Sequence, residues 1–419
     1  MKKITKTLLI ALLSVLSGWS NVVNAQWVAA NGGLPTNEVN SFATIGTTLF
    51  ASTGNISGNG MGVFKSVDNG TNWTACNNGL LSLDTRHILA VLDTLYVAVA
   101  GTSVTDGGIY KSTDHGDTWV QINTGLNRNI AYSIVHNQGV LYTCISAPMS
   151  VRAVYTSTDF GNNWTITSSA VLNDNKIKSF LNIGGNIIAG SDGGTGGVFL
   201  SSDGGATWNP TSITNGTDDL AVIGTTVFAA TGIGVKKSVD NGLTWTATAN
   251  TSGVIDNATA LAVIGNCLFV GTPGGSVYSS SDEGATWTNE STGAPGALSP
   301  EDFGMDGSFL YAGINFKAVG VWRRPLTNFT CGGTNGVNTP QEVNPSLQIY
   351  PNPSTGIFTL VSGSPVADIK VYNVLGELIF TEKTDATTFT IDLTGNPAGV
   401  YFYQVSGGEG VRAGKLVVE

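Results

Sequence analysis

One eight-residue pattern, Ser-x-Asp-x-Gly-x-x-Trp, occurs six times in the chain at nearly regular spacing. The copies occupy residues 66–73, 112–119, 157–164, 201–208, 238–245 and 280–287. Their tryptophans lie 46, 45, 44, 37 and 42 residues apart. A repeat of about 40–45 residues that holds about four short strands is typical of a β-propeller blade. The repeat therefore constrains the fold before any residue points to chemistry.

Residues 260–287 show how one repeat is built. Two apolar runs flank the tight turn Gly265-Asn266, a third run leads into the motif, and Trp287 begins a fourth. Alternating apolar residues bounded by Gly and Asn turns indicate strands and hairpins. Each repeat therefore predicts one four-stranded blade.

A seventh blade is predicted from the two ends of the repeat region. Residues 26–34 resemble residues 118–126, which follow the second motif, and Trp27 precedes Trp73 by one period of 46 residues. Residues 308–326 supply inner strands with no motif after them. We expect the N-terminal strand to complete this last blade, because ring closure removes the exposed sheet edges that invite aggregation. The predicted fold is an all-β, seven-bladed propeller.

The repeated motif resembles the Asp-box, or BNR repeat, of sialidases, sortilin-type receptors, xyloglucanases and the photosystem II assembly propeller. That resemblance implies a structural motif away from any active site, in which the Asp accepts turn N–H groups and the Gly supplies a positive φ. Calcium binding is the weaker alternative, because the alternating ligands and terminal Glu of an EF-hand loop are missing. The residues given this structural role are Asp68, Asp114, Asp159, Asp203, Asp240, Asp282, Trp73, Trp119, Trp164, Trp208, Trp245 and Trp287.

The first 25 residues are typical of a secretory signal peptide. Lys2, Lys3 and Lys6 precede an apolar stretch, residues 8–16, that is too short to span a bilayer. No other segment predicts a membrane span. The signal segment holds three of the 19 basic residues and none of the 29 acidic ones, so the rest of the chain has a net charge of −13. This charge argues against nucleic acid as a partner, because phosphate binding needs a basic face.

Four cysteines offer one possible disulfide. We expect Cys144 and Cys267 to be free and buried, because both lie in apolar strand runs of non-adjacent blades. Cys76 and Cys331 fall on neighbouring blades if the ring closes, so a bond between them is open in an oxidising compartment.

The repeat stops near Asn328, and composition then divides the rest of the chain in two. Residues 329–345 predict a linker, and residues 346–419 predict seven short strands in a small Ig-like β-sandwich. This last segment closely resembles the type A C-terminal sorting domain of the type IX secretion system of Bacteroidetes. The strings that carry the resemblance are residues 349–360, 371–379, 391–405 and 414–419. The resemblance implies contact with the secretion machinery and its sorting protease, removal of the domain, and then surface attachment or release.

We expect any ligand site on the propeller face opposite the motifs, where the connections between strands are longer. Charged residues gather in the loops that lead into each first strand. The second to fourth repeats hold cations, including Arg152 and Lys178, and the other repeats hold acids, which predicts a face with two oppositely charged arcs. The alternative is solvated loop charge that binds nothing. The predicted ligand face consists of Glu38, Arg86, Arg128, Lys176, Asp218, Asp256 and Glu301.

Catalysis has weak support. An acid/base pair for glycoside hydrolysis has four candidates, namely Asp218, Asp219, Glu301 and Asp302. The resemblance to sialidases stops at the motifs, since the arginine-containing string that sialidases show before the first box is missing. Xyloglucanases resemble two such propellers around one cleft, and this chain has one. The three histidines fall on different blades, so we predict neither a metal nor a cofactor.

These observations favour a secreted or cell-surface monomer that binds a glycan or a protein without catalysis. The alternative is a carbohydrate-active glycoside hydrolase, either xyloglucanase-like or sialidase-like. An assembly factor like the photosystem II propeller is disfavoured, because the chain leaves the cell.

Overall fold

The computed structural model describes residues 26–35, 38–54, 60–91, 93–103, 105–126, 130–137, 139–146, 153–167, 172, 175–192, 196–249, 253, 255–273, 276–294, 300–314, 320–329, 348–350, 354–362, 366–373, 377–407 and 410–418. The predicted signal peptide, residues 1–25, lies outside these ranges. Most of the predicted linker does too. The domain boundaries proposed from the sequence therefore stay predictions.

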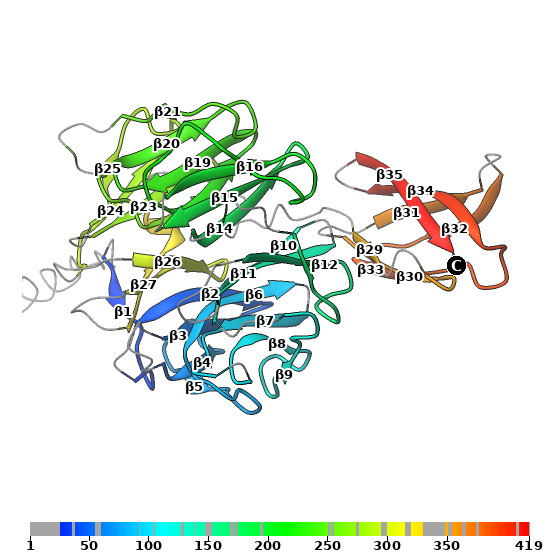
Figure 1. Cartoon of the computed structure of the whole chain (residues 1–419), viewed down its shortest axis with the longest axis horizontal. Coiled ribbons are helices and arrows are strands. Elements are labelled where there is room, and N and C mark those ends of the chain that lie inside the picture. The colour runs from blue at the N-terminus through cyan, green and yellow to red at the C-terminus, as the bar shows by residue number, and fades with distance from the viewer. Residues whose placement is uncertain are drawn as a thin grey trace, which may run out of the picture.

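Seven four-stranded antiparallel sheets form the propeller, one for each predicted blade (Figure 1). Blades one to three contain β2 (Val39–Ile45), β3 (Thr48–Thr53), β4 (Gly62–Ser66), β5 (Thr74–Ala75); β6 (Thr85–Val91), β7 (Thr94–Val99), β8 (Gly108–Ser112), β9 (Val120–Gln121); and β10 (Ile130–Asn137), β11 (Val140–Ser146), β12 (Ala153–Ser157), β13 (Thr165–Ile166). Blades four to six contain β14 (Lys176–Ile183), β15 (Asn186–Asp192), β16 (Gly197–Ser201), β17 (Asn209–Pro210); β18 (Thr217–Ile223), β19 (Thr226–Thr231), β20 (Gly234–Ser238), β21 (Thr246–Ala247); and β22 (Ala260–Ile264), β23 (Cys267–Thr272), β24 (Ser276–Ser280), β25 (Thr288–Asn289).

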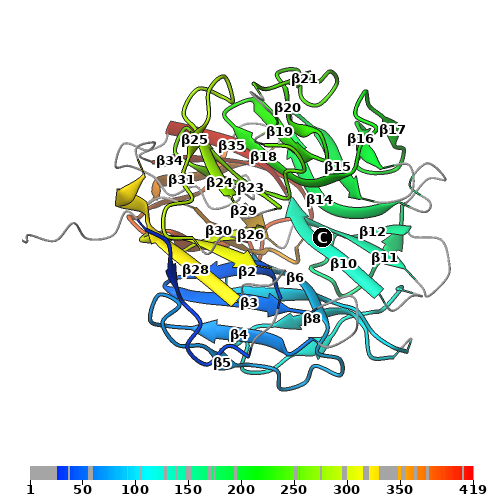
Figure 2. The ribbon, with the colours of Figure 1, turned by 90° about the vertical axis from the view of Figure 1, so that its left-hand side faces the viewer.

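Blade seven is built from both ends of the repeat region, and it closes the ring. It consists of β26 (Pro300–Met305), β27 (Phe309–Ile314), β28 (Gly320–Pro325) and the N-terminal strand β1 (Val28–Ala29). Strand β1 pairs antiparallel with β28, with Val28 opposite Arg323 and Ala29 opposite Trp322. The predicted seven-bladed propeller is therefore confirmed. The first strands of neighbouring blades contact one another, and the blades form a ring around a central axis (Figure 2).

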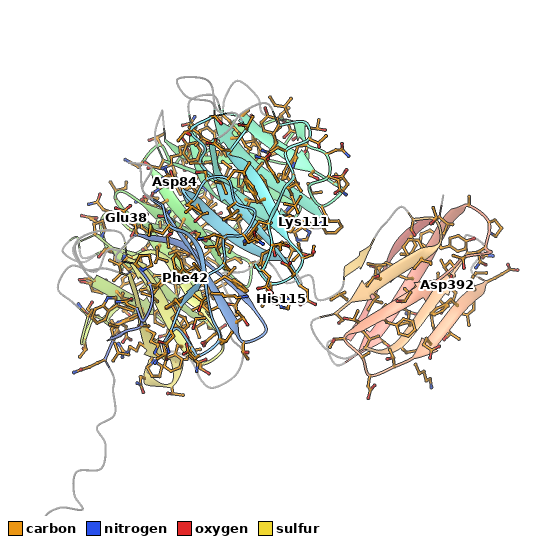
Figure 3. The ribbon with its side chains drawn as sticks, turned by 90° about the horizontal axis from the view of Figure 1, so that it is seen from below. Glu38, Phe42, Asp84, Lys111, His115 and Asp392 are labelled. Atoms are coloured by element: carbon orange, nitrogen blue, oxygen red, sulfur yellow. The ribbon has the colours of Figure 1, made fainter. Side chains whose placement is uncertain are left out.

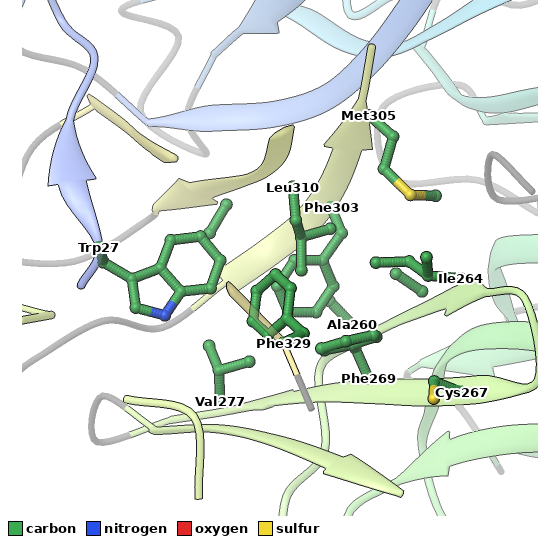
Figure 4. Packing of buried hydrophobic residues seen from close by; sticks show 12 residues of the cluster. Trp27, Ala260, Ile264, Cys267, Phe269, Val277, Phe303, Met305, Leu310 and Phe329 are labelled. Atoms are coloured by element: carbon green, nitrogen blue, oxygen red, sulfur yellow. The ribbon is translucent and has the colours of Figure 1, made fainter. Parts of the chain in front are cut away.

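Trp27 holds the closing strand to the ring. Its side chain is 2% exposed, and its indole N–H donates to the Glu290 carbonyl at 2.8 Å. Its ring meets Phe329 edge-on, with centroids 6.3 Å apart, in the apolar cluster between blades six and seven (Figure 4). Burial of a ring this large contributes several kcal/mol to closure.

All six motifs form the same hydrogen-bonded turn, which the fourth copy illustrates. Ser201 donates to Asp203 at 2.8 Å and accepts the N–H of Gly205, and Asp203 accepts the N–H and hydroxyl of Thr207. These Thr207 bonds favour the carboxylate and lower the pKa of Asp203 to about 2. Trp208 is 2% exposed beneath the turn. The geometry matches the hairpin role that the sequence predicts for this motif.

The C-terminal segment forms a small sandwich of two sheets. One sheet has the order β29-β30-β33 and the other β32-β31-β34-β35, and their core includes Phe358, Ile369 and Leu416. The strands are β29 (Gln348–Tyr350), β30 (Ile357–Val361), β31 (Val366–Tyr372), β32 (Leu378–Lys383), β33 (Thr388–Asp392), β34 (Gly399–Gly407) and β35 (Gly410–Val418). The seven strands predicted from the sequence are all present.

The cysteine predictions need two corrections. Cys76 is a free, buried thiol, so the Cys76–Cys331 bond that the sequence left open does not form. Its side chain packs toward Gly116 of blade two rather than toward blade seven. Cys267, predicted to be free, is disulfide-bonded. Cys144 is buried and forms no disulfide, as expected, and Cys331 lies outside the described residues.

Candidate ligand-binding site on the propeller axis

A cavity of about 260 Å³ lies where the first strands of the blades begin. All seven blades contribute lining residues, from Glu38 of blade one to Asp302 of blade seven. Glu38 and Asp84 lie toward one side of the propeller, and Lys111 and His115, near the second motif, lie toward the other (Figure 3). The cavity is therefore on the face opposite the motifs, where the sequence predicts a ligand site.

A β-bulge in six of the seven first strands supplies the lining. The register of β2, β6, β10, β14, β18 and β26 shifts by one residue near the strand start, so the strand register skips one residue in each strand. Each of these residues lines the cavity, and so does Thr259 at the same position before β22. We call these residues the channel ring: Asn40, Arg86, Tyr132, Lys178, Asp218, Thr259 and Glu301.

The residue after each bulge points to the next blade instead. Asp219 of blade five accepts the N–H of Leu261 in blade six at 2.8 Å, and Asp302 of blade seven accepts the N–H of Phe42 in blade one at 2.9 Å. Each carboxylate also accepts the N–H of its own next residue at 2.8 Å. These two catalytic candidates therefore link blades, which occupies the oxygens that acid/base chemistry would need.

The surroundings of Asp219 and Asp302 disfavour ionisation of their carboxyl groups. Burial raises the pKa of Asp219 to about 6. Burial, with the nearby Asp219 charge as the next cause, raises the pKa of Asp302 to about 8. A carboxyl group that keeps its proton near neutral pH makes folding depend on pH.

We expect Asp302→Asn to remove part of this pH dependence. The raised pKa means that the folded state holds a proton that the unfolded chain has released above about pH 4, so stability is full below that pH and is lost as pH rises through about 8. Asp302 is partly accessible from the cavity, so the slope should be less than about 1.4 kcal/mol per pH unit. Urea unfolding of both proteins between about pH 5 and pH 9 measures this difference. If the free energy of unfolding changes with pH in the same way in both proteins, the raised pKa of Asp302 is contradicted.

Two ion pairs neutralise part of the cavity wall. Lys178 of blade four pairs with Asp218 of blade five and lies 3.7 Å from Asp192. Burial opposes its charge, but the Asp218 and Glu301 carboxylates outweigh burial and raise the pKa of Lys178. Arg86 donates to Asp84 at 2.6 Å. A third catalytic candidate, Asp218, is thus engaged by a cation.

Three further charged side chains line the cavity, and among the described residues none of them forms an ion pair. Lys176 lies over the Tyr132 ring, 5.3 Å from its centroid. Burial and then the Lys178 charge lower the pKa of Lys176. Burial and then the Glu301 charge raise the pKa of Glu38. Like charges therefore gather at two places, Lys176 with Lys178 and Glu38 with Glu301.

Five of the seven residues predicted for the ligand face line this cavity: Glu38, Arg86, Lys176, Asp218 and Glu301. Asp256 does not, because it is exposed in the turn that Gly253 begins. Arg128 and Arg152 lie outside the described residues. The prediction did not include Tyr132 or Thr259. A polar pair just before the apolar run of six of the seven first strands, as in Glu301-Asp302-Phe303, is the signal that could have located the ring.

The histidines do not form a joint site, although the prediction that they fall on three different blades is wrong, because His87 and His115 both belong to blade two. His115 is exposed, 3.7 Å from Asp93 near the second motif, and buried His136 stacks on Phe160. His87 lines the cavity, and burial lowers its pKa to about 4, so its imidazole is neutral. Within the described ranges, no group of three or more His, Cys, Asp and Glu side chains is arranged to hold a metal ion.

Comparison with known families assigns the C-terminal sandwich. Residues 348–419 match the family described as the secretion system C-terminal sorting domain. The chain therefore carries a type IX sorting tail, which directs export to the cell surface or the extracellular space. In the part of the chain that the structure describes, no helix is long and apolar enough to cross a membrane. A sequence comparison found no match among curated proteins.

Solved structures support the propeller fold. PorZ, a surface component of the type-IX secretion system of Porphyromonas gingivalis, is 15% identical over 91% of this chain, with a TM-score of 0.52. The chain spans 59% of PorZ. YCF48 from Cyanidioschyzon merolae is 17% identical over 72% of this chain and 98% of its own, with a TM-score of 0.53. The extracellular domain of BT4673 from B. thetaiotaomicron is 10% identical over 96% of this chain and 60% of its own, with a TM-score of 0.56. At these identities the likeness concerns the fold alone.

Proposed function

We propose that the mature protein is a secreted or cell-surface binding protein whose propeller holds a glycan or protein ligand at the axial cavity. The observation that carries this proposal is the channel ring, which presents polar and charged side chains from all seven blades to one cavity. Polar groups that converge in a concave site mark the default binding site of a fold. The bulges support the same interpretation, since bulges re-aim side chains next to functional sites.

The route to the surface is part of the proposal. Residues 1–25 would direct the chain to the periplasm of a Bacteroidetes cell, and the sorting tail would bring it to the type IX machinery. The sorting protease would then remove the tail, and the propeller would be attached to the surface or released. The mature protein would act as a monomer.

Binding without catalysis fits the cavity better than hydrolysis does. A glycosidase needs two carboxyl groups that are free to act on the substrate. Asp219 and Asp302 accept backbone N–H groups, and Asp218 pairs with Lys178. Glu38 and Glu301 are the remaining pair, and the raised pKa of Glu38 suits a general acid, so glycoside hydrolysis is kept as the second candidate.

Glycan and peptide arrays probed with the mature propeller test the proposal, with a glycosidase screen on the same preparation. We expect selective binding to one class of array ligand and no turnover. Turnover that is lost in Glu38→Gln and in Glu301→Gln would favour the hydrolase. No selective binding on either array, together with no turnover, would overturn the proposed function.

A further inference from the structure

We propose that the axial cavity binds a small zwitterion of the amino-acid type, with its ammonium group at Glu38 and Glu301 and its carboxylate at Lys176. This inference rests on the proposed function and names the chemical class of ligand that the cavity would take. The ligand could be a free amino acid or the charged end of a peptide, since both present the same pair of groups.

Three charged side chains in the cavity have no ion-pair partner among the described residues. Lys178 pairs with Asp218, and Arg86 pairs with Asp84, so these four charges are balanced within the protein. Lys176, Glu38 and Glu301 also line the cavity, and among the described residues none of them forms an ion pair, although Lys178 attracts Glu301 and Arg86 attracts Glu38 at longer range. A partly buried charge without a partner is costly, and a ligand of opposite charge lowers that cost.

The order of the blades places Lys176 on the opposite side of the propeller axis from Glu38 and Glu301. Glu38 belongs to blade one and Glu301 to blade seven, which are neighbours because the ring closes between them. Lys176 begins the first strand of blade four, which lies across the ring from that junction, with three blades on either side. A ligand on the axis therefore has two carboxylates at one end and an ammonium at the other.

At each end of the cavity, burial and a nearby like charge disfavour the charged form of a side chain. Burial is the main cause that lowers the pKa of Lys176 and raises the pKa of Glu38, and the nearby charge adds to it: Lys178 at Lys176, and Glu301 at Glu38. A ligand ammonium between the two glutamates and a ligand carboxylate at Lys176 would relieve both repulsions. A ligand with one charge would relieve one end only, and a neutral sugar would relieve neither.

The size of the cavity favours a small group. Its volume of about 260 Å³ is below the roughly 300–1,000 Å³ of pockets for drug-sized ligands. It therefore suits an amino acid or one chain end rather than an extended polymer. Tyr132 and Thr259 also line the wall, where the Tyr132 ring lies under Lys176 and the Thr259 hydroxyl donates to the Pro300 carbonyl at 2.6 Å.

Titration calorimetry on the mature propeller tests the inference with probes of defined charge. γ-Aminobutyrate and ε-aminocaproate carry both groups at two spacings, while n-butylamine and butyrate each carry one. We expect at least one zwitterion to bind at least about tenfold more tightly than either singly charged probe, a difference of about 1.4 kcal/mol. Comparison of lysine with Nα-acetyl-lysine, whose blocked α-amino group mimics the carboxyl end of a peptide, then separates a free amino acid from a peptide end.

Substitutions of the cavity residues test where the zwitterionic probes bind. Glu301→Gln should weaken the zwitterion about tenfold or more without weakening butyrate, and Lys176→Gln should do so without weakening n-butylamine. Two residues outside the cavity give matched controls: Lys111, which lies 5.9 Å over the Tyr96 ring, and Glu283, which pairs with Lys237. Lys111→Gln and Glu283→Gln should leave zwitterion binding unchanged.

The possible failures can be told apart. If the zwitterions bind no better than the singly charged probes, the inference is overturned, whatever the variants do. If array binding of the mature propeller is then still lost in Glu301→Gln, the proposed function stands with another ligand. If array binding is also unaffected by every cavity variant, the axial site itself is wrong.

Discussion

A chain that lacks residues 346–419 is expected to accumulate in the periplasm, with nearly all surface or extracellular protein lost. The reason is that the type IX sorting tail matched at residues 348–419 is the address for outer-membrane export. The propeller itself should still fold, because its ring closes through β1 and β28 without any strand of the sandwich. Cell fractionation and immunoblotting of the native host measure the distribution.

A full-length Glu301→Gln chain is the control for this experiment, since it alters the cavity and leaves the tail intact. It should reach the surface like the wild type. Normal export of the truncated chain would show that the sandwich is not the address.

Trp27→Ala is expected to lower the free energy of unfolding by about 3–5 kcal/mol, the range for deletion of a large buried aromatic side chain. Trp27 is 2% exposed, bonds the Glu290 carbonyl and packs on Phe329, so the variant loses a hydrogen bond and leaves a cavity beside the closing strand. Urea unfolding followed by tryptophan fluorescence measures the change.

Val28→Ala is the matched control, because Val28 lies in the same strand and is 38% exposed. We expect it to change stability by no more than about 0.5 kcal/mol. A loss below about 1 kcal/mol in Trp27→Ala would mean that the N-terminal strand does not hold the ring closed. Removal of residues 26–34 should have the stronger effect of exposing the β28 edge and causing aggregation.

The blades could be predicted because each repeat carries its own local signals. The turn of each motif forms from side chains within eight residues, as Ser201, Asp203 and Thr207 illustrate. The closing strand was also within reach of the sequence, since Trp27 keeps the period of the repeat although its blade is completed more than 270 residues later.

The roles of individual carboxylates could not be predicted in the same way. Asp218 and Asp219 are adjacent in sequence, yet Asp218 lines the cavity beside Lys178 while Asp219 bonds the backbone of the next blade. The bulge between Thr217 and Asp219 decides which side chain faces the axis, and a bulge leaves no clear composition signal. Cys76 is similar: blade order gives its neighbours, but only the direction of its side chain shows that it faces blade two.

The central claim is that ligands bind at the axial cavity and not at the motif face. The measurement that tests it most directly is array binding by two variants, one for each face, with thermal melting as a check on folding. Glu38→Gln combined with Glu301→Gln removes two cavity charges that the described residues leave without an ion pair, and Asp203→Ala breaks one motif turn. We predict that the double variant loses binding with an unchanged melting temperature, while Asp203→Ala keeps its binding profile. Full binding by the double variant, with loss of binding in Asp203→Ala at an unchanged melting temperature, would contradict the account.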